Sequence, residues 1–407
     1  MMIMIWVNFL AAPPTLIPLE APMPRMRESR RLAARSAVLL VAAAVSLIVA
    51  ACGSSSSGNG SSSSSGLSAA DKAGLTKAQS LLAKYEQRPT QITSTVKISK
   101  PVPKGKTLYW IACGATPECT QEGAIATQAA TLLGWKTVVL NNDGTTQQWK
   151  NDFNQVVSAK PAAVLYTAIP QALFASEVPA LKKNGTFIDA CCVTDLPGTA
   201  TGIGYAIDVP SQIGSIGGAQ AAFVASDSKD TGDSVIVNLP AYQILSTAVT
   251  DYKSGMATYC PTCKVSELDI ALANIANATT TITSYLRAHP QIHYVVAATD
   301  GLTIGLPAAL KAAGLRDVKI VGQGATPTNI QYLHSGEEAF DVAFPYYEAL
   351  WSMVTAAAQN AAGVPVTASV APPLWLLTPN NAPPVSAQAF PEVVNYKSQY
   401  EALWGVG

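Results

Sequence analysis

The sequence predicts an α/β protein built from two doubly wound lobes. The chain has 407 residues, of which 49% are hydrophobic, and this is enough for a large core in two lobes. From residue 106 onward, short and uninterrupted apolar runs alternate with longer helical segments. Such runs are typical of parallel strands covered by helices on both faces. A second series of alternating apolar runs and helical segments begins after Gly202, so we expect two successive lobes.

The expected strands form two series. The first series comprises residues 107–113, 136–140, 162–166 and 186–190, and the second comprises 234–239, 264–270, 293–298 and 318–322. Amphipathic helices lie between them, such as residues 147–159, whose Trp149 and Phe153 are expected to face inward. Ligands of doubly wound (Rossmann-like) sheets bind beyond the carboxyl ends of the strands. The loops that follow the strands are therefore expected to line one cleft between the lobes.

The N-terminal region predicts export. Five arginines between residues 25 and 35 precede an apolar run over 37–49, and small residues follow it. The run is too short for a transmembrane helix, and no later run is long enough for one. We interpret residues 1–51 as a signal peptide, with Met23 and Met26 as alternative starts.

A lipid anchor and a tether are expected next. The residues V-A-A-C at 49–52 resemble a bacterial lipobox, which implies lipidation of Cys52. Residues 53–66 are all Ser, Gly or Asn and cannot form a core, so the segment 52–66 is expected to hold the protein away from the membrane. The expected location is the outer side of the cell membrane.

Residues 67–104 are expected to form an N-terminal helix and a linker. Leu75, Ala78, Leu82 and Tyr85 recur at helical spacing, and Pro89 ends the pattern. The helix either packs on the main domain or continues the stalk.

Composition and motifs exclude several functions. Only 13% of the residues are charged and the formal net charge is zero, so nucleic acid is not an expected partner. The sequence holds no nucleophile elbow, no Ser/His/Asp set and no Walker loop. Its three histidines, His289, His293 and His334, lie at the boundaries of expected elements. We therefore expect no catalysis, no cofactor and no metal.

A family resemblance is most specific over residues 285–324. There a helix ends in H-P, a strand follows, Asp300 caps a helix, and A-L-K-A-A-G precedes a strand that ends in V-G. Together with L-G-W-K-T-V-V-L-N at 133–141 and D-V-P-S-Q-I-G-S-I-G-G at 208–218, this order resembles the type I periplasmic binding proteins. It is most similar to the ribose-binding-like group that serves sugar-type ABC importers. The resemblance covers about residues 106–377.

The resemblance implies a particular organisation and function. Three crossovers, near Asp208, Phe344 and Pro372, would join the lobes and form a hinge. Lobe 1 would comprise residues 105–208 and 345–372, and lobe 2 would comprise 209–344 with 373–407 as its end and C-terminal tail. A monomer would close on a small ligand and deliver it to an ABC permease and its ATPase.

Candidate ligand-binding residues follow the strand ends and the crossovers. They are Cys113, Thr116, Glu118, Cys191, Cys192, Asn238, Tyr242, Tyr252, Asn274, Thr299, Asp300, Gln323, Phe344 and Tyr346. Several of these residues have an ordinary structural role as an alternative to ligand binding. Asp300 can act as a helix cap alone, Glu118 as a solvated carboxylate, and the aromatic residues as ordinary packing.

The chain departs from the usual pattern of sugar-binding relatives. Those relatives usually carry an Asp-Arg pair where this chain has Cys191 and Cys192, and an Asn where it has Thr299. Each buried sugar hydroxyl left without a partner costs about 1–3 kcal/mol. We therefore expect a ligand less polar than a free aldopentose or hexose: a sugar derivative, an aromatic or alicyclic compound, or a molecule with a single anionic group.

Six cysteines remain beyond Cys52, and an even number in an exported chain favours disulfides. They are Cys113, Cys119, Cys191, Cys192, Cys260 and Cys263. Bonds 113–119 and 260–263 are expected. The adjacent pair stays open, because a trans peptide holds neighbouring Cα atoms about 3.8 Å apart, below the usual disulfide range of about 4.4–6.8 Å. It forms either a vicinal disulfide or a bond from one thiol to the 113–119 loop.

Two other functions remain as alternatives. A ligand sensor would hand its closed state to a membrane signalling partner. An exported thiol–disulfide enzyme would use the pair 191–192 or the C-P-T-C motif at 260–263.

Overall fold

The structure is a computed structural model that describes residues 68–229, 231–366 and 371–406. The expected signal peptide, the lipidation of Cys52 and the tether lie outside the described residues. The fold described below belongs to the unit Ser64–Gly407. In its described part, every helix is too short or too polar to traverse a bilayer.

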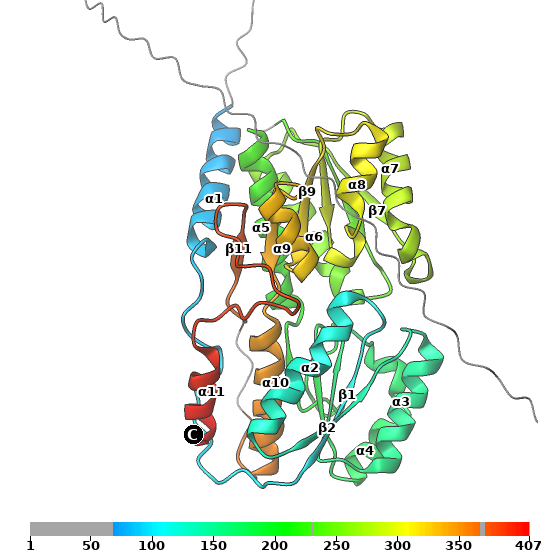
Figure 1. The fold of residues 1–407 in the computed structure, drawn as a ribbon, viewed down its shortest axis with the longest axis vertical. Helices are drawn as coiled ribbons and strands as arrows, with labels where there is room; N and C mark the ends of the chain where they lie inside the picture. Colours follow the sequence, from blue (N-terminus) through cyan, green and yellow to red (C-terminus); the bar gives the residue numbers. More distant parts are fainter. Residues whose placement is uncertain (1–67, 230, 367–370, 407) are drawn as a thin grey trace, which may run out of the picture. The chain divides into compact units, whose positions relative to one another are not determined.

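Lobe 1 is a parallel sheet covered on both faces. Its strand order is β2 (Lys136–Leu140), β1 (Thr107–Ile111), β3 (Ala163–Thr167), β4 (Phe187–Cys191) and β5 (Tyr205–Ile207). The helices are α2 (Pro117–Leu132), α3 (Thr146–Ala159), α4 (Val178–Lys183) and α10 (Tyr346–Ala361), with the 3-10 turn η1 (Gln171–Phe174). Helices α2 and α10 lie together, and α3 and α4 cover the other side (Figure 1).

Lobe 2 repeats this plan with one antiparallel edge strand. Its order is β11 (Trp375–Leu377), β10 (Phe340–Ala343), β9 (Lys319–Gly324), β8 (Tyr294–Ala297), β6 (Ser234–Asn238) and β7 (Val265–Asp269), and β11 runs antiparallel to β10. Its helices are α5 (Pro210–Ser228), α6 (Gln243–Tyr259), α7 (Ala278–Ala288), α8 (Leu306–Ala313) and α9 (Pro327–Ser335), with the 3-10 turns η2 (Leu272–Asn277) and η3 (Asp300–Leu302). Two doubly wound lobes are thus confirmed.

The apolar runs predicted the strands correctly because the central strands of both sheets are buried. Every residue of β3, β6 and β8 is buried, whereas the edge strands β2 and β7 are partly exposed. All eight expected strands are present, with ends shifted by at most two residues. The sequence reading missed β5 and β11, which have only three residues each, and β10, whose four residues include Asp341 and so do not form an apolar run.

Helices α5 and α6 pack at close range along one face of lobe 2. A Cβ atom on Gly217 would lie 2.1 Å from the carbonyl oxygen of Ala248. Gly217 therefore serves helix packing, because no larger residue fits there, whereas a Cβ on Gly218 would have no neighbour within 4 Å among the described residues.

The chain passes between the lobes at the expected places. Asp208 follows β5 with a left-handed backbone (φ 58°) and leads into α5. Phe344 and Pro345 connect β10 to α10, and the third crossover joins α10 to β11. The first crossover follows β5 and the second follows β10, so a hinge motion there would change the space at those strand ends.

Both ends of the described chain pack on the lobes. Helix α1 (Ala69–Tyr85) lies against α5 and α6, where a Cβ on Gly74 would be 2.7 Å from the Tyr259 carbonyl oxygen. This contact settles the alternative between packing and stalk in favour of packing on lobe 2. Helix α11 (Tyr396–Trp404) packs instead on α10, with the Trp404 and Trp351 rings stacked at 5.4 Å.

The position of α11 corrects the expected lobe boundaries. Residues 373–407 were assigned to lobe 2, but only β11 joins that sheet, and the chain then returns to lobe 1. The reason is the aromatic face of α11, whose residues Tyr396, Tyr400 and Trp404 recur every four positions and contact Trp351.

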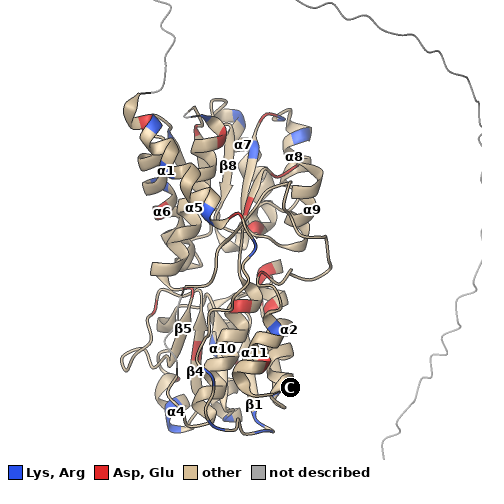
Figure 2. Cartoon of the chain, turned by 90° about the vertical axis from the view of Figure 1, so that its left-hand side faces the viewer, with Lys and Arg blue, Asp and Glu red and all other residues tan. Residues whose placement is uncertain are grey.

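The segments 86–98 and 391–403 run alongside the hinge, and they pair with each other. The Val394 amide donates to the Pro89 carbonyl, and the Ile98 amide donates to the Leu403 carbonyl, each at 3.0 Å. Arg88 donates to the carbonyls of Pro391 and Glu392. These contacts tie residues 86–98 to 391–403 across the side of the molecule shown in Figure 2.

Candidate functional site

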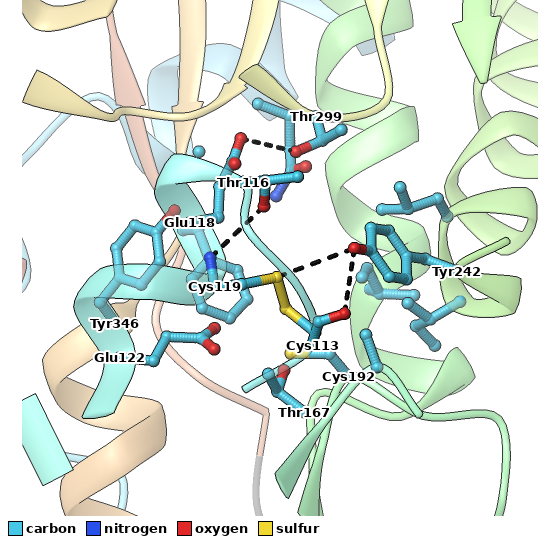
Figure 3. Close-up of a pocket in the computed structure, with 17 residues that line it drawn as sticks. Cys113, Thr116, Glu118, Cys119, Glu122, Thr167, Cys192, Tyr242, Thr299 and Tyr346 are labelled. Carbon is cyan, nitrogen blue, oxygen red and sulfur yellow. Dashed lines mark hydrogen bonds between the residues drawn. A yellow bond between two sulfur atoms is a disulfide. The ribbon is translucent and has the colours of Figure 1, made fainter. Parts of the chain in front are cut away.

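A pocket lies between the lobes at the carboxyl ends of their strands. Lobe 1 contributes Cys113, Thr116, Glu118, Cys119, Glu122, Thr167, Ala168 and Cys192; lobe 2 contributes Ile213, Tyr242, Ile244, Leu245, Thr299, Gln323 and Gly324; the second crossover contributes Phe344 and Tyr346. Figure 3 shows these side chains around a common space. Its place matches the rule that ligands of doubly wound sheets bind beyond the strand ends.

A short closed loop forms one wall of the pocket. Thr116 caps α2 and accepts a hydrogen bond from the Cys119 amide, and Pro117 occupies the first turn of the helix. A disulfide joins Cys113 to Cys119, whose Cα atoms are 5.3 Å apart. The bond ties the end of β1 to the first turn of α2, so the wall is rigid and largely apolar.

Glu118 connects the two lobes at the edge of the pocket. Its Oε1 atom accepts hydrogen bonds from the Thr299 hydroxyl at 2.8 Å and from the Gly301 amide at 2.6 Å. Glu118 belongs to α2 of lobe 1, whereas Thr299 and Gly301 follow β8 of lobe 2. The carboxylate therefore links strand-end loops that only a two-lobed fold brings together.

Tyr242 makes a second connection between the lobes. It precedes α6 of lobe 2, and its hydroxyl donates to the Cys113 carbonyl oxygen at 3.2 Å and lies 3.9 Å from the Cys119 sulfur (Figure 3). Burial, together with the nearby Glu118 and Glu122 carboxylates, raises the pKa of Tyr242, so the hydroxyl stays protonated and acts as a donor.

Glu122 is a buried acid that the sequence reading missed. It is 3% exposed, and burial followed by the charge of Glu118 raises its pKa well above the usual range. It lies four residues after Glu118, and this spacing places both on one face of α2. That spacing is the signal that could have found it. Figure 2 shows acidic positions on α2 where the lobes meet.

The adjacent cysteines are bonded to each other. The structure contains a vicinal disulfide between Cys191 and Cys192, and Cys192 has a left-handed backbone (φ 61°). Cys192 lines the pocket, while Cys191 is fully buried behind it and does not. The Cys192 amide donates to Ile207 at 3.0 Å, and burial raises the pKa of the neighbouring Asp208 to about 7. The pair thus packs against the first crossover.

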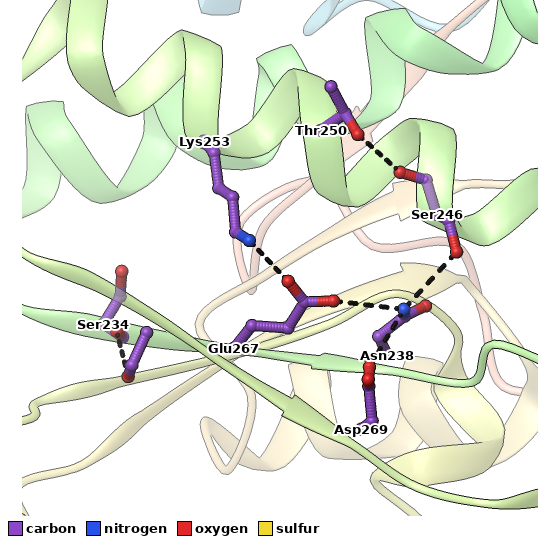
Figure 4. A network of polar contacts seen from close by, with 8 residues as sticks. Ser234, Asn238, Ser246, Thr250, Lys253, Glu267 and Asp269 are labelled. Carbon is purple, nitrogen blue, oxygen red and sulfur yellow. Dashed lines mark hydrogen bonds and ion pairs between the residues drawn. The ribbon is translucent and has the colours of Figure 1, made fainter.

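Four other predicted ligand residues lie outside the pocket. Tyr252 is fully buried on α6 and donates to the Ser234 hydroxyl at 2.7 Å, because it faces β6 rather than the cleft. Asn274 is exposed within η2. Asn238 ends β6 but turns sideways, where its amide donates to Asp269 and Glu267 of β7 at 3.1 and 3.3 Å (Figure 4).

Asp300 is the fourth, and it supports the pocket from behind. It is fully buried and accepts hydrogen bonds from the amides of Gln323 and Thr326 at 3.0 and 2.9 Å. It thereby positions Gln323, which lines the pocket, so its contact with a ligand is indirect. The capping role is not observed either, because Thr299 is the N-cap residue of η3 and no side chain accepts a capping hydrogen bond there.

Two groups in the described part of the chain have the composition of metal sites. Asp300, Glu338 and Asp341 each offer an oxygen within 4.8 Å of the others, and Cys191, Cys192 and Asp208 form the second group. Burial raises the pKa of each acid in the first group, to about 7 for Asp300; the charge of Glu118 adds to the rise at Asp300, and the charge of Asp300 adds to it at Glu338 and Asp341. Asp300, Glu338 and Asp341 accept hydrogen bonds from Gln323, Asn329 and Ala325, and the disulfide removes the thiolates of the second group.

The remaining lining residues that sequence reasoning missed are mostly aliphatic. Ile213 lies in the first turn of α5, and Ile244 and Leu245 lie in the first turn of α6. They follow strand-end loops, but aliphatic residues in a first helical turn carry no signal of a binding site in a sequence. Thr167 and Gly324 are the last residues of β3 and β9, and Ala168 follows β3, so all three lie at strand ends, where the sequence placed the cleft.

The third disulfide, Cys260–Cys263, lies far from these loops, between α6 and β7. Its Cα atoms are 5.4 Å apart, and Cys260 is fully buried. The position fits the expected structural clip.

The fold and the interlobe pocket define a type I periplasmic binding protein. The family model described as a periplasmic binding protein domain matches residues 119–364, which is more than half of the chain. The chain therefore belongs to this family. No curated protein matches it in sequence.

Solved structures share this fold at low sequence identity. An ABC sugar transporter subunit from Rhodobacter sphaeroides is 20% identical, with a TM-score of 0.60 over 68% of this chain and 99% of that one. A solute-binding protein from Burkholderia graminis in complex with D-arabinose is 15% identical, with a TM-score of 0.62 over 68% and 96%. One from Bacillus halodurans with bound myo-inositol is 18% identical, with a TM-score of 0.59 over 69% and 96%. These likenesses concern the fold.

Proposed function

We propose that this protein captures a small ligand between its lobes by hinge closure and delivers it to an ABC-type importer. The observation that carries the proposal is the pair of interlobe contacts that border the pocket. Glu118 reaches Thr299 and Gly301, and Tyr242 reaches Cys113. A ligand in this pocket would touch both lobes, so its binding energy would favour the closed arrangement over an open one.

The pocket walls support a ligand that is less polar than a simple aldose. Three aliphatic side chains, two aromatic rings of the second crossover and two disulfides contribute to the lining. The structural neighbours were solved with D-arabinose and myo-inositol, so a sugar derivative fits both the fold and these walls. The proposal includes no catalytic step.

The lipoprotein part of the proposal rests on the sequence. Lipidation of Cys52 would anchor the chain on the outer side of the cell membrane, and the Ser/Gly tether would let the lobes reach a permease. Incorporation of labelled palmitate, and its loss in Cys52→Ala, tests this step. Incorporation that persists in the variant would contradict it.

Native mass spectrometry of the purified protein tests the proposed capture. A closed binding protein is expected to retain its ligand, so the spectrum should contain a protein species heavier by one small molecule. Uptake of that molecule by cells should then fall when the protein is removed. Unchanged uptake would contradict the importer role and would favour a sensor that signals to a membrane partner.

A further inference from the structure

Two glutamate side chains, Glu118 and Glu122, line the pocket without a cation of the protein among the described lining residues. One oxygen of each, Oε2, is buried without a hydrogen-bond partner among the described residues. Buried polar atoms are normally paired, and an unpaired one costs about 1–3 kcal/mol. The unpaired atoms therefore indicate that a bound ligand supplies the missing donors.

We propose that the natural ligand is a small amine, whose ammonium group binds between Glu118 and Glu122 while its body lies against the aromatic and aliphatic wall. This inference rests on the proposed function, because it identifies the ligand class of the same pocket. An ammonium group offers several N–H donors on one centre, whereas a hydroxyl offers one. The two glutamates lie one helical turn apart, with about 5–6 Å expected between their Cβ atoms.

Aromatic rings complete the environment that an ammonium group requires. Phe344 and Tyr346 meet edge to face with their centroids 4.7 Å apart, and Tyr242 lines the pocket as well. Figure 3 shows Tyr346 and Tyr242 on either side of Cys119. Faces of aromatic rings attract cations, and the attraction grows where water is excluded.

The same charges argue against an anionic ligand. Among the described residues that line the pocket, none is Lys, Arg or His. A carboxylate or phosphate placed there would face two carboxyl groups with no cation to offset them. Of the ligand classes considered from the sequence, the molecule with a single anionic group is therefore the one that this pocket disfavours.

Binding of an amine has a proton signature. Glu122 is buried and its pKa is raised, which favours its protonated form while the pocket is empty. An ammonium group stabilises the ionised carboxylate, and the proton leaves to the buffer. The net reaction takes up one cation and releases one proton.

Titration calorimetry with matched probes tests the inference on the full chain after removal of co-purified ligand. The pairs are D-glucosamine with D-glucose, and cyclohexylamine with cyclohexanol, so that the members of each pair differ in the amino group. The two pairs differ in the body of the molecule, which is a sugar ring in one and a cyclohexane ring in the other. In whichever pair binds, the amine should bind about tenfold or more tightly than the alcohol. Alcohols that bind as tightly as the amines, or a failure of both amines to bind, would overturn the inference.

Two isosteric variants locate the effect. Glu122→Gln should weaken amine binding by about tenfold and abolish the proton release, while the affinity for neutral probes stays the same. Glu118→Gln should also weaken it, but this variant disturbs the interlobe contact as well, so Glu122→Gln is the more specific test. Glu337→Gln, which removes an exposed acid after α9, should bind like the unaltered protein. Equal amine affinity and proton release in Glu122→Gln would overturn the proposal.

The failure of this inference is distinguishable from failure of the proposed function. If the retained ligand lacks a basic nitrogen and its uptake still depends on the protein, capture and delivery stand and the amine assignment is wrong. If amines bind but no uptake depends on the protein, the ligand class stands and the importer role is wrong.

Discussion

Glu118 accepts a hydrogen bond from Thr299 at 2.8 Å, and this contact joins α2 of one lobe to the loop after β8 of the other. The two residues are 181 positions apart in the sequence. Both became candidates because they follow strands, and the structure brings them together at the edge of one pocket. In the proposed function the Glu118 carboxylate would stabilise the closed arrangement, and its second oxygen would be available to a ligand.

Thr299→Val is expected to weaken ligand binding. The valine keeps the volume but removes the hydroxyl that Glu118 accepts from, and a hydrogen bond to a charged group is worth about 1.5–3 kcal/mol. Because the contact forms between the lobes, the loss should be seen in the affinity and hardly in the unfolding of each lobe. Calorimetry with the retained ligand checks this, and Thr131→Val on the exposed end of α2 is the matched control. Equal affinity in the two variants would contradict the closure role.

Tyr242→Phe is expected to lower affinity by about fivefold, since a neutral hydrogen bond contributes about 1 kcal/mol. The variant removes the donor to the Cys113 carbonyl and leaves the ring against the disulfide. The dissociation rate should rise while the association rate is unchanged, because the contact forms after the ligand has entered. Stopped-flow fluorescence measures both rates. An unchanged dissociation rate would show that this contact does not hold the lobes together.

The six cysteines of the described region are expected to contain no free thiol. Peptide mapping without reduction should place the bonds 113–119, 191–192 and 260–263. A double variant, Cys113→Ser with Cys119→Ser, should lose about 2 kcal/mol of stability, the value expected for a short closed loop. Denaturant unfolding measures this loss. Rapid alkylation of the native protein at these positions would contradict the pairing.

Stability is expected to fall from acidic to alkaline pH. Glu392 is buried beside α10, and burial raises its pKa from 4.5 to about 8. Since the folded pKa lies above the unfolded one, its contribution is full below about pH 4.5, declines as the pH rises, and is lost above about pH 8. Asp208, with a pKa of about 7, acts in the same direction.

Glu392→Gln tests the origin of this pH dependence. Its amide still accepts from the Tyr346 amide proton and cannot ionise, so the variant should lose part of the decline in melting temperature between pH 5 and pH 9. Glu86→Gln, at an exposed position, should keep the full decline. If the melting temperatures of Glu392→Gln and the unaltered protein decline in parallel with pH, other acids cause the decline.

Trp404→Ala is expected to destabilise lobe 1 by about 3–5 kcal/mol, the usual cost of removing a buried aromatic side chain. Trp404 is 3% exposed, stacks on Trp351 and donates to the Thr355 hydroxyl at 2.9 Å. Differential scanning calorimetry checks the loss. A change below 1 kcal/mol, which is small for a buried aromatic residue, would place α11 outside the cooperative unit.

The sequence predicted most of the fold because buried parallel strands leave a strong local signal. Runs such as 163–166 and 294–298 are apolar throughout, whereas β5 and β11 have three residues each and depend on their neighbours for pairing. The return of α11 to lobe 1 was missed for a related reason. An aromatic helix face indicates burial but does not say against which lobe.

The site was predictable where position along a strand decides it. Thr299 follows β8, Gln323 lies at the end of β9, and both line the pocket, as the topology implies. Asn238 and Asp300 occupy equivalent positions, yet their side chains are taken up by neighbouring backbone and polar groups, and such competition depends on three-dimensional contacts. Glu122 was missed because a carboxylate inside a helix looks like a solvated residue unless its burial is known.

The central claim, that ligand binding closes the two lobes over this pocket, is tested most directly by a distance measurement between them. Spin labels on cysteines introduced at Val139 in lobe 1 and Ile304 in lobe 2, both 37% exposed, would report the interlobe distance by electron double resonance. The account predicts a broad distribution without ligand that becomes shorter and narrower when the retained ligand is added back. The same distribution with and without bound ligand would contradict it.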